Sequence, residues 1–213
     1  MPKTRKKKLV IILVSIAAVV MLGCIATAII VRNLEFGFAR QVSQEEKMLR
    51  LQVVCTAENW LGANEGDGSH QEIIDLYNQH RPLAQGYLVQ YADNWCAAFG
   101  SVAAIQTGLT DIIPTECSCE RQIGLFADLG RWEEADNYVP LPGDYIFYCT
   151  ENILPGDCTD WSNHVGIVTG TCLGYIKVIE GNAGEQVTYR YIPINDCSIR
   201  GFGLPDYSSK VNN

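Results

Sequence analysis

The sequence predicts an α+β domain in which helices come first and a small antiparallel β-sheet follows. Apolar residues recur at helical spacing up to about residue 129, whereas short β-branched and aromatic segments follow Pro140, separated by Gly, Pro, Asn and Asp. Helices followed by strands are typical of this fold class. An uncharged run of 23 residues near the start also predicts one transmembrane helix ahead of the domain.

The chain begins with a basic segment, residues 1–8, and the uncharged run occupies residues 9–31. At about 1.5 Å per residue this run can cross a hydrocarbon layer about 30 Å thick. The positive charges before it predict that residues 1–8 stay in the cytoplasm and that the domain lies outside. A cleaved signal peptide, with a small-residue site at residues 26–28, is the alternative and would make the domain secreted. The length of the run favours a retained anchor.

The charges are divided unevenly along the chain. Five of the 16 basic residues precede the apolar run and all 24 acidic residues follow it, so the outer part carries a net charge of −13. Nucleic acid held by charge attraction is excluded, because phosphate binding needs a basic patch. The acidic segments at residues 63–70 and 155–160 lack EF-hand spacing. We therefore assign no metal site and no cofactor, and calcium stays open.

We expect four helices in the first part of the domain, at residues 34–60, 71–80, 95–107 and 120–129. The first is a helix leaving the membrane, and residues 32–51 count as a juxtamembrane helix or linker. Ser69 and Glu72 resemble a capping box at the start of the second helix.

Five strands are expected after Pro140, at residues 143–149, 164–170, 175–182, 187–194 and 199–203. The folded domain then spans residues 52–207, and residues 208–213 form a tail. Nine cysteines are present. Cys149 and Cys158 bracket a short loop containing Pro and Gly, and they are the best candidates for a disulfide, which a location outside the cell permits.

Cys96 stands at the start of the third predicted helix, where the partial positive charge of a helix N-terminus favours a thiolate. This position makes Cys96 a candidate nucleophile. A buried packing cysteine is the alternative. Asp93 and Asn94 precede it and are candidates for a second oxyanion donor or a substrate contact, but a helix cap is favoured for both. The small residues that follow would let the helix pack closely on a sheet.

Three histidines are available as a base. His70 and His80 fit solvated surface positions, whereas His164 opens a predicted strand, with Gly166 beside it on the same face. That glycine leaves room for a substrate or a neighbouring helix. In the following strand, period-two alternation places Glu180 and Asn182 side by side. Either could accept the imidazole N–H and orient the ring.

Taken together, these residues resemble the CHAP domain, the cysteine/histidine-dependent amidohydrolase/peptidase branch of the papain-like fold. The matching pieces are "NWCAAF" (94–99), "LPGDYIFY" (141–148), "NHVGIV" (163–168) and "VIEGN" (178–182), and the resemblance covers roughly residues 52–207. By resemblance, Cys96 is the nucleophile, His164 the general base and then acid, Glu180 the orienting group and Asn182 a second polar support.

The resemblance implies that the chain cleaves an amide bond of peptidoglycan through a thioester, as an endopeptidase or an N-acetylmuramoyl-L-alanine amidase. The expected location is a bacterial cell membrane, with the domain facing the wall. The expected partners are peptidoglycan, the membrane through residues 9–31, and a secretion or conjugation apparatus. Two alternatives stay open: a papain-like enzyme acting on a non-wall substrate, and a non-catalytic membrane-tethered binding or scaffold module of the same fold.

Overall fold

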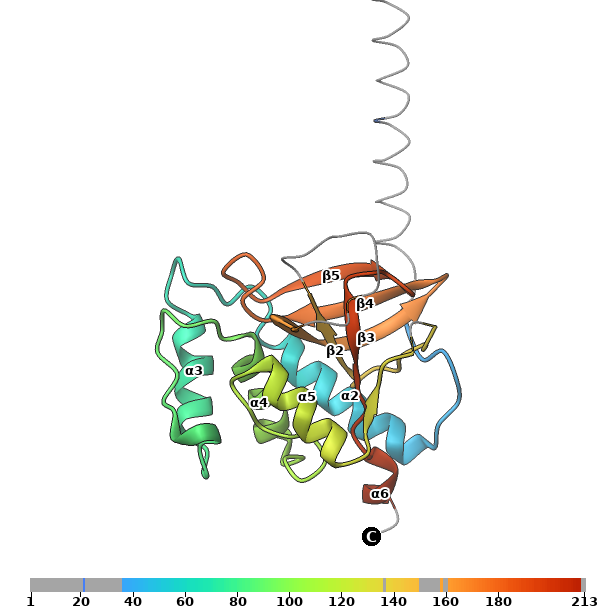
Figure 1. Ribbon diagram of the computed structural model, residues 1–213, viewed down its shortest axis with the longest axis horizontal. Coiled ribbons are helices and arrows are strands. Elements are labelled where there is room, and N and C mark those ends of the chain that lie inside the picture. The colour runs from blue at the N-terminus through green and yellow to red at the C-terminus, as the bar shows by residue number, and fades with distance from the viewer. Residues whose placement is uncertain (1–20, 22–35, 136, 150–157, 159–160, 212–213) are drawn as a thin grey trace, which may run out of the picture. The chain divides into compact units, whose positions relative to one another are not determined.

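The computed structural model describes residues 21, 36–135, 137–149, 158 and 161–211. In this part of the chain, four α-helices and one short 3₁₀ helix (Ala84–Gly86) are followed by six strands and then a short fifth α-helix (Figure 1). This order confirms the α+β class. Within those ranges no helix is both long and apolar enough to cross a membrane. The predicted anchor at residues 9–31 and the basic segment before it lie outside the described residues, apart from Met21.

The helices agree with the expected positions except at their starts. The first begins later than residue 34, because Ser43 caps it by accepting the Glu46 N–H (3.1 Å) and Gly37 pairs with Thr171 of the sheet instead. No side chain caps the second helix, so the predicted capping box at Ser69 is wrong. The helices are α2 (Gln44–Glu58), α3 (His70–Gln79), α4 (Cys96–Thr107), α5 (Cys119–Asp128) and α6 (Tyr207–Val211).

The sheet is antiparallel throughout, in the order β1-β6-β2-β3-β4-β5. The two-residue β1 was not expected, because so short a segment shows no alternation. Cys149 and Cys158 form the predicted disulfide. The strands are β1 (Trp132–Glu133), β2 (Tyr145–Tyr148), β3 (His164–Cys172), β4 (Tyr175–Glu180), β5 (Thr188–Pro193) and β6 (Ile199–Gly203).

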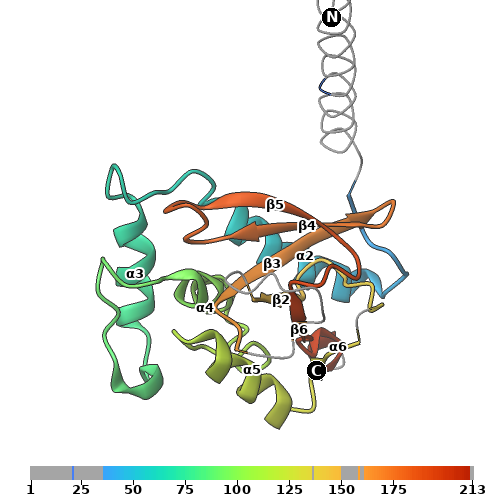
Figure 2. The same ribbon diagram turned by 45° about the horizontal axis from the view of Figure 1, so that its top comes forward.

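The helix that carries Cys96 packs directly on the sheet. Its first nine residues are all buried, and α4 lies along β3 (Figure 2). Small side chains permit the close approach: Tyr145 of β2 donates its hydroxyl to the carbonyl of Gly100 (2.8 Å), and a Cβ at Gly100 would lie 3.0 Å from the Tyr145 ring. The main apolar core fills the space between this face of the sheet and the helices, and a smaller cluster covers the other face.

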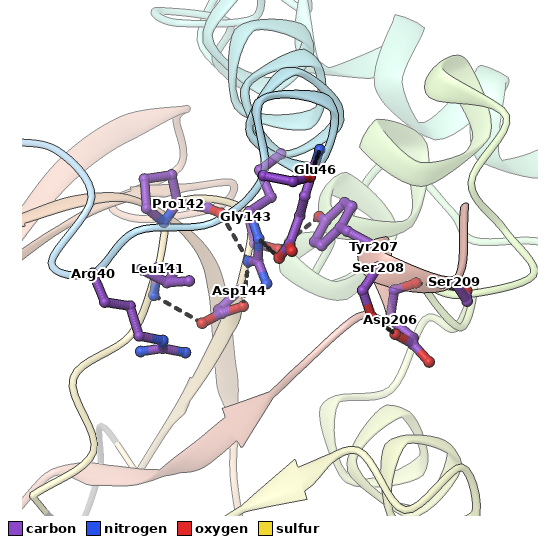
Figure 3. Close-up of polar contacts among 12 residues, drawn as sticks. Arg40, Glu46, Leu141, Pro142, Gly143, Asp144, Asp206, Tyr207, Ser208 and Ser209 are labelled. Carbon is purple, nitrogen blue, oxygen red and sulfur yellow. Dashed lines mark hydrogen bonds and ion pairs between the residues drawn. The ribbon is translucent and has the colours of Figure 1, made fainter. Parts of the chain in front are cut away.

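A buried ion pair ties α2 to the turn before β2 (Figure 3). Arg50 donates to Asp144 Oδ1 (2.8 Å) and to the carbonyl of Pro142 (3.1 Å), and its Nε pairs with Glu46 (2.7 Å). Asp144 also accepts the Leu141 N–H (2.8 Å). The compact unit begins at Phe36. It therefore includes residues 36–51 of the segment counted as a linker, and Arg50 of that segment takes part in this network.

Candidate active site

Cys96 is the first residue of α4 and is only 4% exposed. The preceding loop does not cap the helix as expected. Asp93 instead accepts hydrogen bonds from the Tyr87 hydroxyl (2.7 Å) and the Gln90 N–H (2.8 Å), and no side chain caps the first turn. Asn94 is exposed. The first-turn N–H groups beside the thiol are therefore left without a side-chain acceptor, which suits the binding of a developing oxyanion.

His164 opens β3 beside the start of α4, and its ring stacks on Tyr148 of β2 (centroids 6.1 Å apart). The space beside it is filled, contrary to the expectation of room for a substrate or a helix. Gly166 lies directly opposite Glu180, and a Cβ at Gly166 would lie 2.5 Å from a Val178 methyl and 2.9 Å from the Glu180 Cγ. The glycine thus makes space for the carboxylate that faces the imidazole.

Glu180 is completely buried at the end of β4, and its two oxygens face two different partners. Oε2 lies 3.5 Å from Nε2 of His164, while Oε1 accepts a hydrogen bond from Nε of Arg190 (2.6 Å). The first distance is that of an ion pair rather than a short hydrogen bond, as is common in active sites without substrate. Glu180 thus lies against the imidazole that it is predicted to orient.

Asn182 lies apart from this pair, so the structure does not place it as a second support for the imidazole. β4 ends at Glu180, and Asn182 adopts a left-handed conformation (φ 56°) in the turn that follows. Its amide contacts the Asn94 side chain (3.3 Å). With the amide oriented to satisfy both neighbours, it accepts the Trp95 N–H and donates to Glu65, each at 3.3 Å. Asn182 therefore braces Trp95, the residue before Cys96.

Electrostatics within the cluster favour charged forms. The pKa of Cys96 lies well below its ordinary value, because a hydrogen bond from Cys119 and the hydrogen bond and charge of His164 outweigh burial. Burial would lower the pKa of His164, but a hydrogen bond with Cys96 and the negative charges of Cys96 and Glu180 raise it to about 9. Burial would raise the pKa of Glu180, yet His164 and Arg190 lower it. These shifts favour the thiolate, the imidazolium and the carboxylate over the neutral forms.

Two groups of this cluster were not found from the sequence. Arg190 lies opposite Val178 in the β4–β5 pairing, and Val178 is two residues before Glu180 on the same face of β4. Pairing the two predicted strands as a hairpin would therefore have placed Arg190 on the face of Glu180. Cys119 begins α5, and its Sγ lies 3.7 Å from Sγ of Cys96. No local pattern signals this contact, because it depends on how two helices pack.

Other features lie away from this cluster. His70 is buried and contacts the carbonyls of Asn64 and Tyr91, so its predicted surface position is wrong. In the described part of the chain, no group of three or more His, Cys, Asp or Glu side chains could hold a metal ion. A cavity of about 780 Å³ lies between α2 and residues 210–211 and contains none of the catalytic candidates.

Comparison with known proteins assigns this chain to no family. Neither protein-family models nor curated proteins match this chain. The four sequence motifs and the arrangement of Cys96, His164 and Glu180 are therefore the features that point to a function. This arrangement places a thiol with a lowered pKa near an imidazole, and a buried carboxylate against that imidazole, as the chemistry of a cysteine nucleophile requires.

Proposed function

We propose that the chain is a cysteine-dependent amidohydrolase/peptidase of the CHAP type, with a papain-like fold, that cleaves an amide bond of peptidoglycan. The observation that carries the proposal is the buried row formed by Cys96, His164 and Glu180, with Oε2 of Glu180 3.5 Å from the imidazole. A nucleophile at the start of a helix that packs on an antiparallel sheet supports the fold assignment.

The proposed reaction has two steps. The Cys96 thiolate attacks the amide carbonyl carbon, and first-turn N–H groups of α4 stabilise the oxyanion. His164 gives its proton to the leaving amine as the C–N bond breaks, which leaves a thioester on Cys96. His164 then takes a proton from water, the resulting hydroxide attacks the thioester, and the carboxylic acid leaves as the thiolate re-forms. Glu180 keeps the imidazole oriented and favours its charged form throughout.

The location follows from the apolar run. We propose that residues 9–31 anchor the chain in a bacterial cell membrane with the catalytic domain facing the wall. A tethered hydrolase opens the wall locally, which suits a secretion or conjugation apparatus better than general lysis. Deletion of residues 1–31 should therefore abolish function in cells, and unchanged function after that deletion would count against the tether.

The activity is tested with purified peptidoglycan. The full-length chain in detergent micelles, kept reduced, is incubated with walls of several chemistries, with and without calcium, and the fragments are identified by mass spectrometry. The variants are Cys96→Ala and a matched control, Cys55→Ala, which removes an exposed free thiol elsewhere.

We expect new amino termini with the wild type and with Cys55→Ala, and none with Cys96→Ala. The chemistry of those termini separates an amidase from an endopeptidase. If every wall stays intact while the protein is folded and Cys96 reacts rapidly with iodoacetamide, an enzyme acting on a non-wall substrate replaces the wall hydrolase. If Cys96 reacts no faster than a free model thiol, the non-catalytic module replaces both.

A further inference from the structure

A second thiol lies within reach of the candidate nucleophile. Cys119 Sγ is 3.7 Å from Cys96 Sγ. Both residues are buried: Cys119 is 7% exposed and Cys96 is 4% exposed. The two residues open two different helices, α5 and α4. A disulfide requires the sulfurs to approach to about 2.05 Å. The two sulfurs therefore have to move closer, from 3.7 Å to about 2.05 Å. Rotation of the two side chains about their own bonds is expected to supply this movement, because each cysteine is the first residue of its helix.

We propose that Cys119 is a resolving thiol that captures oxidised Cys96 as a reversible disulfide, making this pair an oxidation site for peroxides. The proposal rests on the proposed function only in taking Cys96 to be a reactive thiolate. Oxidation would block the nucleophile, and a dithiol would restore it. A nucleophile with a resolving partner is also protected from irreversible oxidation to the sulfinic acid.

Hydrogen peroxide oxidises the pair in two steps. The Cys96 thiolate attacks one oxygen of hydrogen peroxide, so an S–O bond forms, the O–O bond breaks and hydroxide leaves. The Cys119 thiol then loses its proton and its sulfur attacks Sγ of Cys96. An S–S bond forms, the S–O bond breaks, and the departing hydroxide takes up a proton as water. The two electrons lost by the sulfurs reduce the peroxide, and two exchange steps with a dithiol reverse the change.

The charges support this order of events. While Cys96 is a thiolate, its hydrogen bond to Cys119, together with burial, holds the pKa of Cys119 well above the ordinary thiol value. Conversion of Cys96 to a neutral sulfenic acid removes the adjacent anion, so the pKa of Cys119 falls when its nucleophilic form is needed. Cys96 is therefore the sulfur that is oxidised first.

Cys117 is the natural competitor, because it lies two residues from Cys119 on the same segment. Its contacts point elsewhere: its Sγ lies 3.5 Å from Glu116 Oε1 and 3.8 Å from Gln85 Nε2. Burial and the charge of Glu116 raise its pKa. Cys117→Ser therefore provides a matched control for Cys119→Ser.

The test uses the full-length chain in detergent, reduced, freed of reductant and treated with hydrogen peroxide. Free thiols are then blocked with iodoacetamide, and the protein is cut after glutamate without reduction. This cleavage places Cys96 alone in a peptide of residues 73–116 and both Cys117 and Cys119 in residues 117–120. Mass spectrometry measures the linked pair, the alkylation of Cys96 and its sulfinic acid, before and after dithiothreitol.

We expect the wild type and Cys117→Ser to form the link and to lose Cys96 alkylation, which dithiothreitol then restores. Cys119→Ser should form no link, and its Cys96 should pass to sulfinic acid that dithiothreitol does not reverse. A wild type that accumulates sulfinic acid without the link would overturn the proposal, as would a link that persists in Cys119→Ser. None of these readouts requires wall cleavage, so failure of the hydrolase proposal would leave this result interpretable.

Discussion

His164 and Glu180 face each other across two neighbouring strands, with Nε2 of the imidazole 3.5 Å from Oε2 of the carboxylate. The strand register makes this contact possible, because Glu180 lies opposite Gly166, two residues beyond the histidine on the same face. A residue with a side chain at position 166 would collide with the glutamate. Three positions of two strands thus determine the orientation of the candidate base.

Replacing Glu180 with Gln should slow the proposed reaction on the order of 10²–10⁴-fold. The amide keeps the shape of the side chain but cannot stabilise the imidazolium, and it favours the wrong tautomer. The rate of peptidoglycan cleavage and the rate of Cys96 alkylation at pH 7 should fall together. Glu116→Gln, which changes another buried glutamate, should leave both rates unchanged. Equal rates in wild type and Glu180→Gln would remove Glu180 from the mechanism.

Cleavage and alkylation should respond differently to high pH. Above about pH 9, His164 loses the proton that it would give to the leaving amine, so wall cleavage should decline. Alkylation needs only the thiolate and should not decline there. The two profiles, measured on the same preparation from about pH 5 to about pH 10.5, test this, because that range spans the ordinary pKa values of histidine and cysteine. A parallel fall in both would show that the protein loses its fold instead.

The same proton also affects stability. Because the pKa of His164 is raised in the folded protein, the protonated ring stabilises the folded state. This stabilisation is fully present at pH values below 6.5, the ordinary pKa of histidine. This contribution is lost as the pH rises from 6.5 through about 9. Cys96 contributes the opposite trend, because its lowered pKa makes the thiolate stabilise the folded state increasingly over the same window. The free energy of unfolding in urea should therefore stay nearly constant over this window in the wild type and rise in His164→Gln, where only the Cys96 contribution is left. The same pH dependence in both proteins would remove His164 from the balance.

Asn182→Ala should lower the free energy of unfolding by about 1–2 kcal/mol, because alanine is strained in the left-handed conformation. The pH dependence of Cys96 alkylation should stay unchanged, since the Asn182 amide contacts the loop before Cys96 and not the imidazole. Asn182→Gly keeps the backbone conformation and isolates the loss of the amide. A shifted alkylation profile in Asn182→Gly would restore the original prediction that Asn182 supports the imidazole.

Gly166→Ala should lower the free energy of unfolding by about 1–3 kcal/mol through overpacking. It should also slow Cys96 alkylation, because the added Cβ would lie 2.9 Å from the Glu180 Cγ and displace the carboxylate. Gly124→Ala is the matched control: nothing lies near its Cβ in α5, and the change should stabilise the protein by about 0.5–1 kcal/mol. An unaffected alkylation rate in Gly166→Ala would show that the site tolerates a moved Glu180.

Local pattern was sufficient for the order of elements and for the central groups of the site. Alternation along two strands predicted that His164 and Gly166 share a face and that Glu180 projects from the neighbouring strand, and the β3–β4 register agrees. The disulfide between Cys149 and Cys158 also followed from a short bracketed loop. These features depend on neighbours in sequence or on adjacent strands, so periodicity and spacing are enough to predict them.

Tertiary packing decided the rest. Alternation stops where a strand ends, so the left-handed turn after Glu180 carried Asn182 away from the imidazole. Asp93 is held by Tyr87 and Gln90 and is not free to cap α4. The approach of Cys119 to Cys96 depends on how α5 meets α4 across 23 residues of chain. Such contacts join surfaces of separate elements, and their distances follow from the packing of whole helices and strands rather than from any local pattern.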